Sequence, residues 1–300
     1  MKKTSNLKFR NQLVLGWLLL LPSFIILGIF VFYPMLKTFF LSTQLTDLMG
    51  NPIKFIGFKN FSNLFTSDSF MTSFTITLIF VFFSTLLTLV LAYLMAMSAS
   101  QKIMGIAVFR TMFSSTMGVS VTVASILWLF MFNPQIGMFS KILTFLHLPQ
   151  INFLSDPTWS LVAIIGTTVW MNLGFAFLIL LGAIQAIPQD LYQVADLDGA
   201  SWLMRLRKIT IPATSPTIFF VTVVTLINAF QTFGQVDILT SGGPDYHTNL
   251  LVYAIYQDAF VNHSVGRASA QSVILTIIIM LFTMIQFYVK NRKGANYANE

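Results

Sequence analysis

The stretch IPQDLYQVADLDGASWLMRLRKITIPATSP, residues 187–216, is a polar interruption between two strongly apolar segments. It carries three basic residues, Arg205, Arg207 and Lys208, and a glycine, Gly199, that can end a helix. Apolar residues recur at helical spacing on both sides of Gly199, so the stretch predicts two short amphipathic helices. Helices this short are unstable alone in water. We therefore expect them to lie against lipid headgroups or against a partner protein.

The composition outside this stretch is that of a membrane protein. Of the 300 residues, 56% are hydrophobic and 9% are charged, whereas a soluble domain carries about 25% charged residues. Apolar runs of about 20 residues, long enough to cross a bilayer, predict six transmembrane helices. Pro212 and Pro216 are predicted to end the second short helix before the fifth span. We expect the six spans at residues 13–33, 70–97, 112–132, 159–186, 218–238 and 271–288.

These spans divide the chain into four parts. Residues 1–12 form a polar tail, and residues 13–69 hold the first span and an extracytoplasmic interfacial segment. Residues 70–290 form a core of five spans that includes the stretch quoted above, and residues 291–300 form a second tail. The interfacial segment mixes aromatic residues with Lys and Asn, which favours the membrane surface over a buried strand.

Positive charge is distributed unequally between the two sides of the predicted bundle. Twelve of the 17 Lys and Arg lie in the two tails and in the loops after spans two and four. The other five are Lys37, Lys54, Lys59, Lys141 and Arg267. Cytoplasmic loops carry the excess of Lys and Arg, so both termini and residues 187–216 are predicted to be cytoplasmic. The same bias explains the net charge of +7, and no basic stripe indicates nucleic acid.

The sequence lacks the groups that would drive transport or catalysis within this chain. It has no cysteine and a single glutamate, Glu300, and no carboxylate lies in the middle of a predicted span. An ion-coupled carrier usually needs such a carboxylate or a helix broken by Gly or Pro, and neither is evident. No GxxxxGK[ST] phosphate loop occurs, and His147, His247 and His263 are scattered in outer loops. We predict that the chain is not an enzyme, holds no metal or cofactor, and receives its energy from a partner.

The opening stretch resembles the EAA loop of ABC importer permeases. The family pattern is EAA-x2-DGA, a spacer and IxLP. It is matched here by Gln193-Val194-Ala195, Asp198-Gly199-Ala200 and Ile209-Thr210-Ile211-Pro212. Further similarity covers Ile187 to Tyr192, Phe132-Asn133-Pro134, the outer loop Thr240 to Thr248, and Gly266, Ala268 and Ala270. Together these features resemble the carbohydrate-importer permeases that pair with a second, homologous permease.

This resemblance implies an all-α fold with six transmembrane helices, the type I ABC importer permease fold, in the bacterial plasma (inner) membrane. It implies as partners a second homologous permease, two cytoplasmic ATPase subunits that bind ATP and Mg, an extracytoplasmic solute-binding protein, and membrane lipid. The residues implied to couple the chain to the ATPase are Gln193, Ala195, Asp198, Gly199, Ala200, Ile211 and Pro212. Gln193 stands where the family has glutamate, so it offers only neutral hydrogen bonds, which are weaker.

A carbohydrate site needs amide and aromatic side chains that face a cavity. The candidates for the substrate path are Trp170, Asn172, Asn228, Phe230 and Gln231. The alternative is that these groups form hydrogen bonds between helices of the bundle. The absence of Arg and Lys from the middle of the spans favours uncharged sugars, oligosaccharides in particular. Two other functions stay open: a permease for glycerol phosphate or another polar solute, and a self-sufficient channel or ion-coupled carrier.

Overall fold

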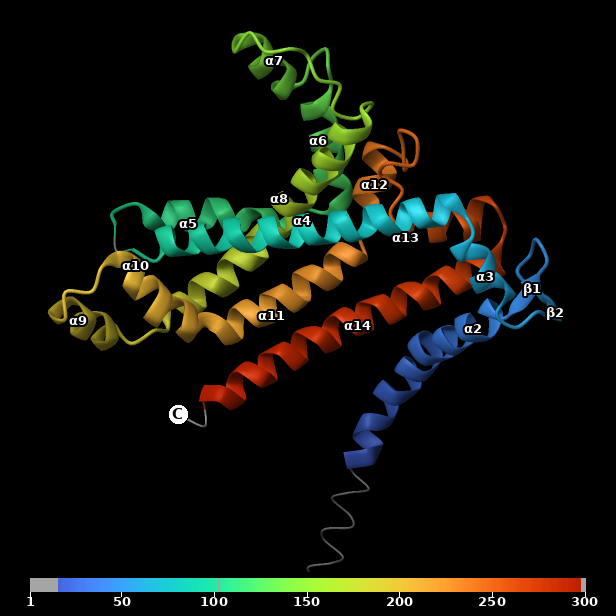
Figure 1. The fold of residues 1–300 in the computed structure, drawn as a ribbon, viewed down its shortest axis with the longest axis horizontal. Helices are drawn as coiled ribbons and strands as arrows, with labels where there is room; N and C mark the ends of the chain where they lie inside the picture. The colour runs from blue at the N-terminus through green and yellow to red at the C-terminus, as the bar shows by residue number, and fades with distance from the viewer. Residues whose placement is uncertain (1–15, 102, 298–300) are drawn as a thin grey trace, which may run out of the picture. The chain divides into compact units, whose positions relative to one another are not determined.

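The structure, a computed structural model, describes residues 16–101 and 103–297, so the predicted tail 1–12 and Lys102 lie outside the described residues. The described chain is mostly helical and forms two compact units, drawn as a ribbon in Figure 1. Unit 1 combines the residues up to Leu64 with Gln257–Ile274. Unit 2 combines Phe65–Tyr256 with the residues from Leu275 onward.

The predicted six-span, all-α fold is confirmed, with one span strongly bent. Five described helices are long and apolar enough to cross a membrane, and a bent pair of helices makes the sixth candidate. The five are Gly16–Ser42, Asp68–Ala99, Pro157–Gln185, Trp202–Phe230 and Val265–Lys290. The pair, Ile106–Gly118 and Val121–Phe132, is bent by 107°. The side of the membrane on which each end lies stays a prediction.

Unit 1 begins with the helical span Gly16–Ser42, which contains a π-turn, η1 (Gly28–Phe32), and α2 (Tyr33–Ser42). An unpredicted antiparallel hairpin follows, and its strands are β1 (Gln44–Thr46) and β2 (Pro52–Phe55). The Asp47 carboxylate closes its turn by accepting hydrogen bonds from the backbone N–H groups of Asn51 and Met49, at 2.7 and 2.9 Å. These bonds, chiefly those from Asn51, lower the pKa of Asp47, because they favour the charged carboxylate. The unit continues with α3 (Lys59–Phe65), η4 (Gln257–Val261) and the start of α14 (Val265–Tyr297).

Gly266, in the first turn of α14, is enclosed by backbone from the N-terminal part of unit 1. Its N–H donates to Thr46 Oγ1 at 3.1 Å. A Cβ at this position would lie 2.6 Å from the carbonyl oxygen of Gln44 and 3.3 Å from Asn60 Nδ2. Asn60 Nδ2 itself donates to the carbonyl oxygens of Ser42 and Gln44, at 2.9 Å each. We call the site that Gln44, Thr46 and Asn60 form around Gly266 the glycine cradle. Only glycine fits it without a shift of backbone.

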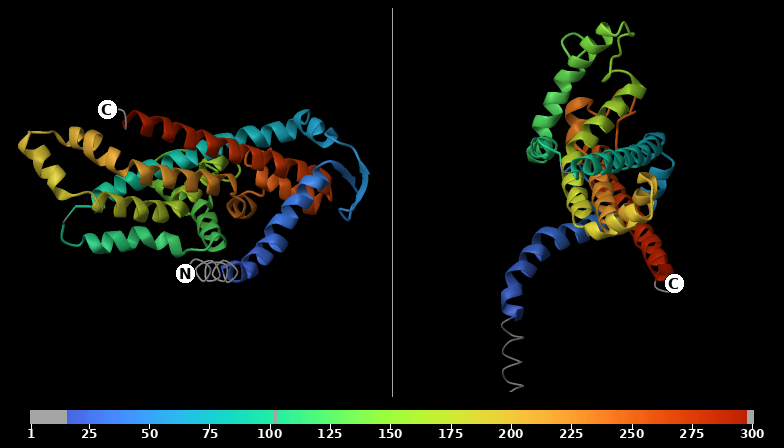
Figure 2. Two further views of the ribbon diagram at one scale, coloured as in Figure 1. Left: turned by 90° about the horizontal axis from the view of Figure 1, so that it is seen from below. Right: turned by 90° about the vertical axis from the view of Figure 1, so that its left-hand side faces the viewer.

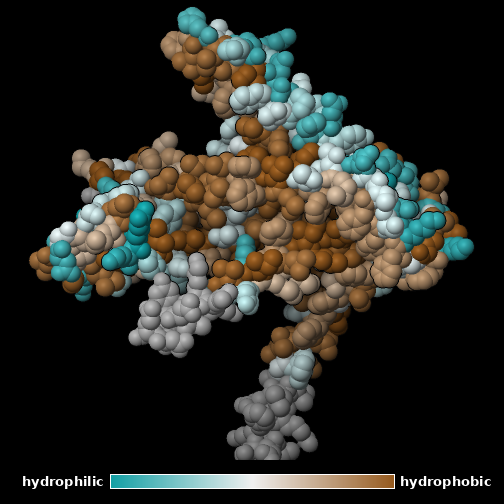
Figure 3. Space-filling view, in the orientation of Figure 1, coloured by the Kyte–Doolittle hydropathy of each residue, from teal (hydrophilic) through white to brown (hydrophobic). Residues whose placement is uncertain are grey.

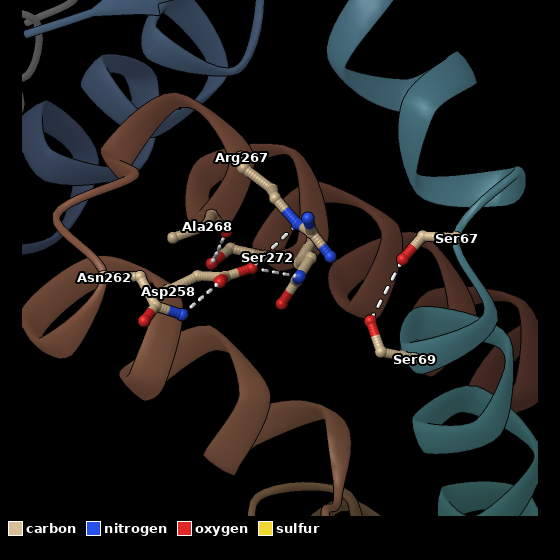
Figure 4. Close-up of polar contacts among 8 residues, drawn as sticks. Ser67, Ser69, Asp258, Asn262, Arg267, Ala268 and Ser272 are labelled. Carbon is tan, nitrogen blue, oxygen red and sulfur yellow. Dashed lines mark hydrogen bonds and ion pairs between the residues drawn. The ribbon is translucent and has the colours of Figure 1, made fainter.

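A buried carboxylate closes the turn between η4 and α14 in unit 1 (Figure 4). Asp258, which is 9% exposed, accepts hydrogen bonds from Asn262 Nδ2 at 3.0 Å and Gln271 Nε2 at 2.7 Å. Arg267 Nε lies 3.0 Å from the same carboxylate. A buried charge is tolerated when it is paired and hydrogen-bonded, and this arrangement fixes the chain reversal before α14.

Unit 2 is built on two long helices, α4 (Asp68–Ala99) and α8 (Pro157–Gln185), which pack along each other (Figures 1 and 2). Their contact includes the small buried residues Ala92, Ala96 and Ala99 of α4 and Ala176 of α8. Small residues let helix backbones approach closely, which strengthens dispersion contacts where lipid removes the hydrophobic drive. The helix α11 (Ile211–Phe230) packs against both, and its Val221 is fully buried in the same core.

The other elements of unit 2 extend this three-helix core. The helix α5 (Ile106–Ser114) packs against α8, and its Arg110 Nη2 donates to the last carbonyl oxygen of α4, that of Ala99, at 2.7 Å. Hydrophobic residues cover much of the visible face, whereas hydrophilic residues gather over α9 and α7 (Figure 3). The remaining elements are η2 (Ser115–Gly118), α6 (Val121–Phe132), α7 (Met138–Phe145), α9 (Gln189–Leu197), α10 (Trp202–Arg205), η3 (Leu206–Thr210), α12 (Gly234–Leu239) and α13 (Leu251–Tyr256).

The prediction that Pro212 and Pro216 end the second short helix is wrong. The helix runs on from Trp202 to Phe230 through α10, η3 and α11. Pro212 lies in the first turn of α11, directly after the π-turn η3, where the wider backbone tolerates its missing N–H. Pro216 lies inside α11. The span therefore begins well before the expected residue 218.

Candidate functional site

Unit 2 contains a cavity of about 470 Å³ at a place where two helical segments are broken. Irregular backbone at membrane depth is tolerated where it lines a water-filled cavity, so the breaks and the cavity belong together. Four segments contribute to its wall. They are Thr116, Met117, Val119 and Val121 at the bend before α6; Met171, Asn172 and Phe175 of α8; Asn228 of α11; and residues 231–235 after α11.

The first break replaces the straight span expected at residues 112–132. The hydroxyl groups of Ser114, Ser115 and Thr116 donate back to carbonyl oxygens three residues earlier, at 3.1, 2.7 and 3.4 Å. Such bonds compete with the helical pattern and bend helices, and here the chain tightens into the 3-10 turn η2. Ser120 Oγ then accepts from the N–H of Val123 at 3.3 Å and caps a new helix, α6.

The second break falls inside the span expected at residues 218–238. The helix α11 ends at Phe230, and α12 begins at Gly234. A Cβ at Gly234 would lie 2.7 Å from Val121 Cγ1, so the two breaks are in close contact. Gly174 of α8 allows a second close approach: a Cβ there would collide with Thr116 Oγ1 and would lie 3.1 Å from the backbone of η2.

The polar groups of the cavity are side-chain amides and hydroxyls, and none of the lining residues is charged. Asn172 Nδ2 donates to the carbonyl oxygen of Thr168 on its own helix, at 2.9 Å. The side-chain amides of Asn228 and Gln231 are exposed, and the described chain offers them no hydrogen bond. The alternative of hydrogen bonds between helices therefore does not describe these two residues, whose amides are free to bind a ligand or water.

Two of the five candidates for the substrate path do not line the cavity. Trp170 packs edge-on against Trp128, with ring centroids 5.9 Å apart, in an aromatic cluster with α6 and α7. Phe230 is 1% exposed and packs against Phe282. Sequence reasoning missed the other ten wall residues, among them Thr116, Met171, Phe175, Thr232 and Gln235. The run of three hydroxyl residues before Gly118 was the available signal.

Between α8 and α11 the chain forms the first predicted short helix as α9, whereas the second, α10, continues through η3 into α11. Gly199 separates α9 from α10 with a φ of +68°, in the left-handed region that favours glycine. The N–H of Ala200 donates to the carbonyl oxygen of Ala195 at 2.9 Å, which closes the end of α9 as a C-terminal cap. Ser201 Oγ accepts from the N–H of Met204 at 3.3 Å and caps α10.

The predicted coupling residues fall into two groups along this loop. Gln193, Ala195, Asp198, Gly199 and Ala200 lie on α9 and the turn after it, whereas Ile211 and Pro212 lie in the first turn of α11. An ion pair that the sequence reasoning missed joins Asp196 of α9 to Arg205 of α10. Opposite charges on either side of Gly199 were the available signal. The loop lies at one end of the α4–α8–α11 bundle (Figure 2).

Comparison with known proteins decides the family. Residues 88–293, more than half of the chain, match the family model described as "Binding-protein-dependent transport system inner membrane component". The chain belongs to this family.

The relatives of this permease agree with its assignment to this family, and a solved structure has the same fold. The sn-glycerol-3-phosphate transport system permease protein UgpA of Agrobacterium fabrum is 36% identical over 286 residues, which cover 95% of this chain and 97% of the relative. The protein of the same name from Rhizobium meliloti is 35% identical over 290 residues, 95% of this chain and 97% of that one. A bacterial ABC transporter involved in the import of the acidic polysaccharide alginate has the same fold. Its TM-score is 0.83 at 22% identity, over 97% of this chain and 99% of that one.

The predicted family is thereby confirmed, and with it the expectation of a transport subunit rather than an enzyme. This permease is a multi-pass inner membrane component of a binding-protein-dependent ABC importer. Within residues 16–101 and 103–297, no group of three or more metal-binding side chains is found. The roles of the individual loop and cavity residues stay predictions.

Proposed function

We propose that this permease carries a neutral carbohydrate, an oligosaccharide in particular, through the cavity between its two helix breaks. The observation that carries the proposal is an amide-lined wall with no charged side chain. Sugar hydroxyls both donate and accept hydrogen bonds, and the free amides of Asn228 and Gln231 can do both in return. Phe175 and Phe233 offer apolar surface to the CH faces of a sugar. The volume of about 470 Å³ falls within the range of ordinary ligand pockets.

A second candidate substrate is sn-glycerol 3-phosphate, because the relatives named above are permeases for that compound. Its phosphate would need a cationic partner, since buried charges are normally paired. None of the residues that line this cavity is cationic, so a second permease would have to supply the positive charge. The neutral carbohydrate needs no such contribution, and we favour it for this reason.

The amides of the cavity give the test that separates these candidates. Replacing Asn228 or Gln231 with leucine should lower uptake of a neutral oligosaccharide about tenfold, because each change removes ligand hydrogen bonds worth about 1 kcal/mol or more. Uptake would be measured in proteoliposomes that contain the complex co-purified with the tagged chain, with maltotriose and sn-glycerol 3-phosphate as labelled probes. Phe220→Leu is the control, because Phe220 is exposed on the same helix but does not line the cavity. Saturable uptake of sn-glycerol 3-phosphate without uptake of the oligosaccharide would overturn the proposal in favour of the second candidate.

The proposed transport cycle needs the partners that the family resemblance implies. A second homologous permease would complete the path, a binding protein would deliver the substrate, and two ATPase subunits would bind ATP and Mg. One solved relative of the same fold is an alginate ABC transporter in complex with an alginate pentasaccharide-bound periplasmic protein. ATP-driven closure of the ATPase subunits would then switch the cavity between the two sides of the membrane.

The loop from α9 to α10 is the proposed docking surface for an ATPase subunit. Large apolar side chains are exposed on it: Val194 is 58% exposed, Leu197 88% and Trp202 61%. Exposed apolar clusters with a polar rim mark interaction sites. The turn at Gly199 presents these side chains, and the predicted cytoplasmic location of the loop fits an ATPase partner.

Replacing Gln193 with glutamate should preserve coupled transport and should leave the ATPase bound at least as firmly. A carboxylate forms stronger, charge-assisted hydrogen bonds with a basic partner than an amide does. The measurement is the amount of ATPase that co-purifies with the tagged chain as salt is raised. Gln189→Glu adds the same charge to the first turn of the same helix and serves as the control. Loss of the ATPase with Gln193→Glu alone would show that the ATPase presents an acidic group there.

A further inference from the structure

The α9–α10 loop has little apolar anchorage to the helices of unit 2. Neither α9 nor α10 contains a buried residue. A cavity of about 230 Å³ lies beneath the loop, lined by the ends of α4 and α8 and by Tyr192, Trp202, Arg205 and Thr210 among others. A displacement of α9 therefore reaches the spans through the covalent chain and through whatever polar contacts cross this gap.

Besides the partly exposed ion pair of Asp196 with Arg205, one hydrogen bond links α9 to the helix that follows it in the described part of the chain. Tyr192 Oη lies 2.9 Å from Thr210 Oγ1, at the junction of η3 and α11. Thr210 is 6% exposed, and its own hydroxyl is directed to the carbonyl oxygen of Arg205 at 3.4 Å. Either hydroxyl group can be the donor in the bond between Tyr192 and Thr210.

A second pair of bonds continues from Thr210 into the core. Thr214 Oγ1 donates to the carbonyl oxygen of Thr210 at 2.7 Å. Its only proton is used there, so Tyr93 Oη of α4, 3.0 Å away, donates to Thr214 Oγ1. Thr214 is completely buried, where an unmade hydrogen bond is costly. The bonds thus run without interruption from α9 through the start of α11 to α4.

We propose that Tyr192, Thr210, Thr214 and Tyr93 are positioning residues that transmit a displacement of α9 to α11 and α4. This inference rests on the proposed docking of the loop on an ATPase subunit. The transmitted movement reaches the cavity directly, because α11 carries Thr214 in its first turns and Asn228 near its end. The π-turn η3 precedes this junction, and such turns mark places where a helix can adjust.

The test removes single hydroxyl groups from the complex that co-purifies with the tagged chain. Tyr192→Phe and Thr214→Val should each lower the amount of maltotriose transported per ATP hydrolysed about fivefold, as expected for one lost hydrogen bond. The double variant should be no worse than the single ones, because both changes interrupt the same linkage. Thr214→Ser keeps the hydroxyl and should restore coupling. Thr225→Val is the matched control, since Thr225 is buried on α11 but bonds only to carbonyl oxygens of its own helix.

The distance between spin labels on α9 and α4 distinguishes residues that transmit a movement of α9 from residues that only stabilise the fold. This chain has no cysteine, so Gln189→Cys on α9 and Leu94→Cys on α4 would carry the only two spin labels in a complex whose partner subunits are cysteine-free variants; both side chains are exposed. When the hydrogen bonds from Tyr192 to Tyr93 are intact, the distance between the two labels should not change on addition of ATP, because α9 and α4 move together. In the Thr214→Val background the distance should change.

Three results would overturn the linkage. They are normal transport per ATP in both single variants, an equal loss in Thr225→Val, and loss of the ATPase from Tyr192→Phe during purification. The last result would make Tyr192 a docking residue and would leave the proposed function standing. The proposed docking of the loop, by contrast, fails if the loop can be disrupted at Gly199 without loss of coupled transport.

Discussion

Replacing Gly199 with valine should lower coupled transport by more than about tenfold, while membrane insertion of the chain is preserved. The left-handed backbone at this residue costs a side chain with a Cβ about 1–2 kcal/mol, and a β-branched residue more. The cap that ends α9 is then lost, and the exposed apolar residues on either side of the turn separate. Uptake of the labelled substrate and ATP hydrolysis stimulated by the binding protein are the two measurements.

Two further variants make this result specific. Gly105 has a φ of +86°, and a Cβ there would meet no atom within 4 Å, as is also true at Gly199. Gly105→Val therefore carries similar strain outside the coupling loop and should keep most of the coupled transport. Gly199→Asn should also keep much of it, because asparagine tolerates the left-handed conformation. Coupled transport that survives Gly199→Val at the normal rate would refute the docking role of the loop.

The second large effect is expected at Gly174, where α8 approaches the bend before α6. Gly174→Ala places a methyl group against Thr116 and against the backbone of η2. Overpacking of this kind costs about 1–3 kcal/mol, and relief requires η2 to move at the wall of the cavity. We expect the purified complex to unfold at a lower temperature. We also expect substrate uptake to fall by a larger factor than the amount of complex that is recovered.

Gly182 on the same helix provides the control for this change. A Cβ at Gly182 would meet no atom within 4 Å, and alanine is favoured over glycine in a helix by about 1 kcal/mol. Gly182→Ala should therefore be neutral or stabilising. If Gly174→Ala behaves in the same way, the close approach of α8 to η2 is not what shapes the cavity.

The sequence predicts the parts of this fold whose signals are local. Hydropathy over about 20 residues locates the spans because each helix must satisfy its own backbone in lipid. The turn at Gly199 is predicted for a similar reason, since a glycine between two amphipathic segments marks a C-terminal cap. Asn228 and Gln231 are three residues apart, and the structure places both at the cavity, Asn228 on α11 and Gln231 directly after its end.

The parts that were not predicted depend on contacts between distant residues. The bend before α6 is fitted to Gly174 of α8, and the break after α11 is fitted to Val121. Hydropathy across either break is that of an ordinary span and reveals neither, and the run of hydroxyl residues before Gly118 is a local signal for the first break alone. Trp170 was selected for its residue type, but packing against Trp128 determines where its ring lies. The helix through Pro212 also required the π-turn of η3, for which the sequence holds no clear signal.

The glycine cradle in unit 1 has a consequence for the biogenesis of the protein. The hairpin and Asn60 are synthesised long before Gly266. At about 5–20 residues per second, the interval between them is on the order of ten to forty seconds. Throughout that time the hydroxyl of Thr46 lacks the donor that Gly266 later provides. The unit that is started first during translation is thus completed by the last helix to enter the bilayer. Unit 1 is therefore complete only when its N-terminal segment has bound the start of the last helix. A nascent chain released before Gly266 has an incomplete unit 1.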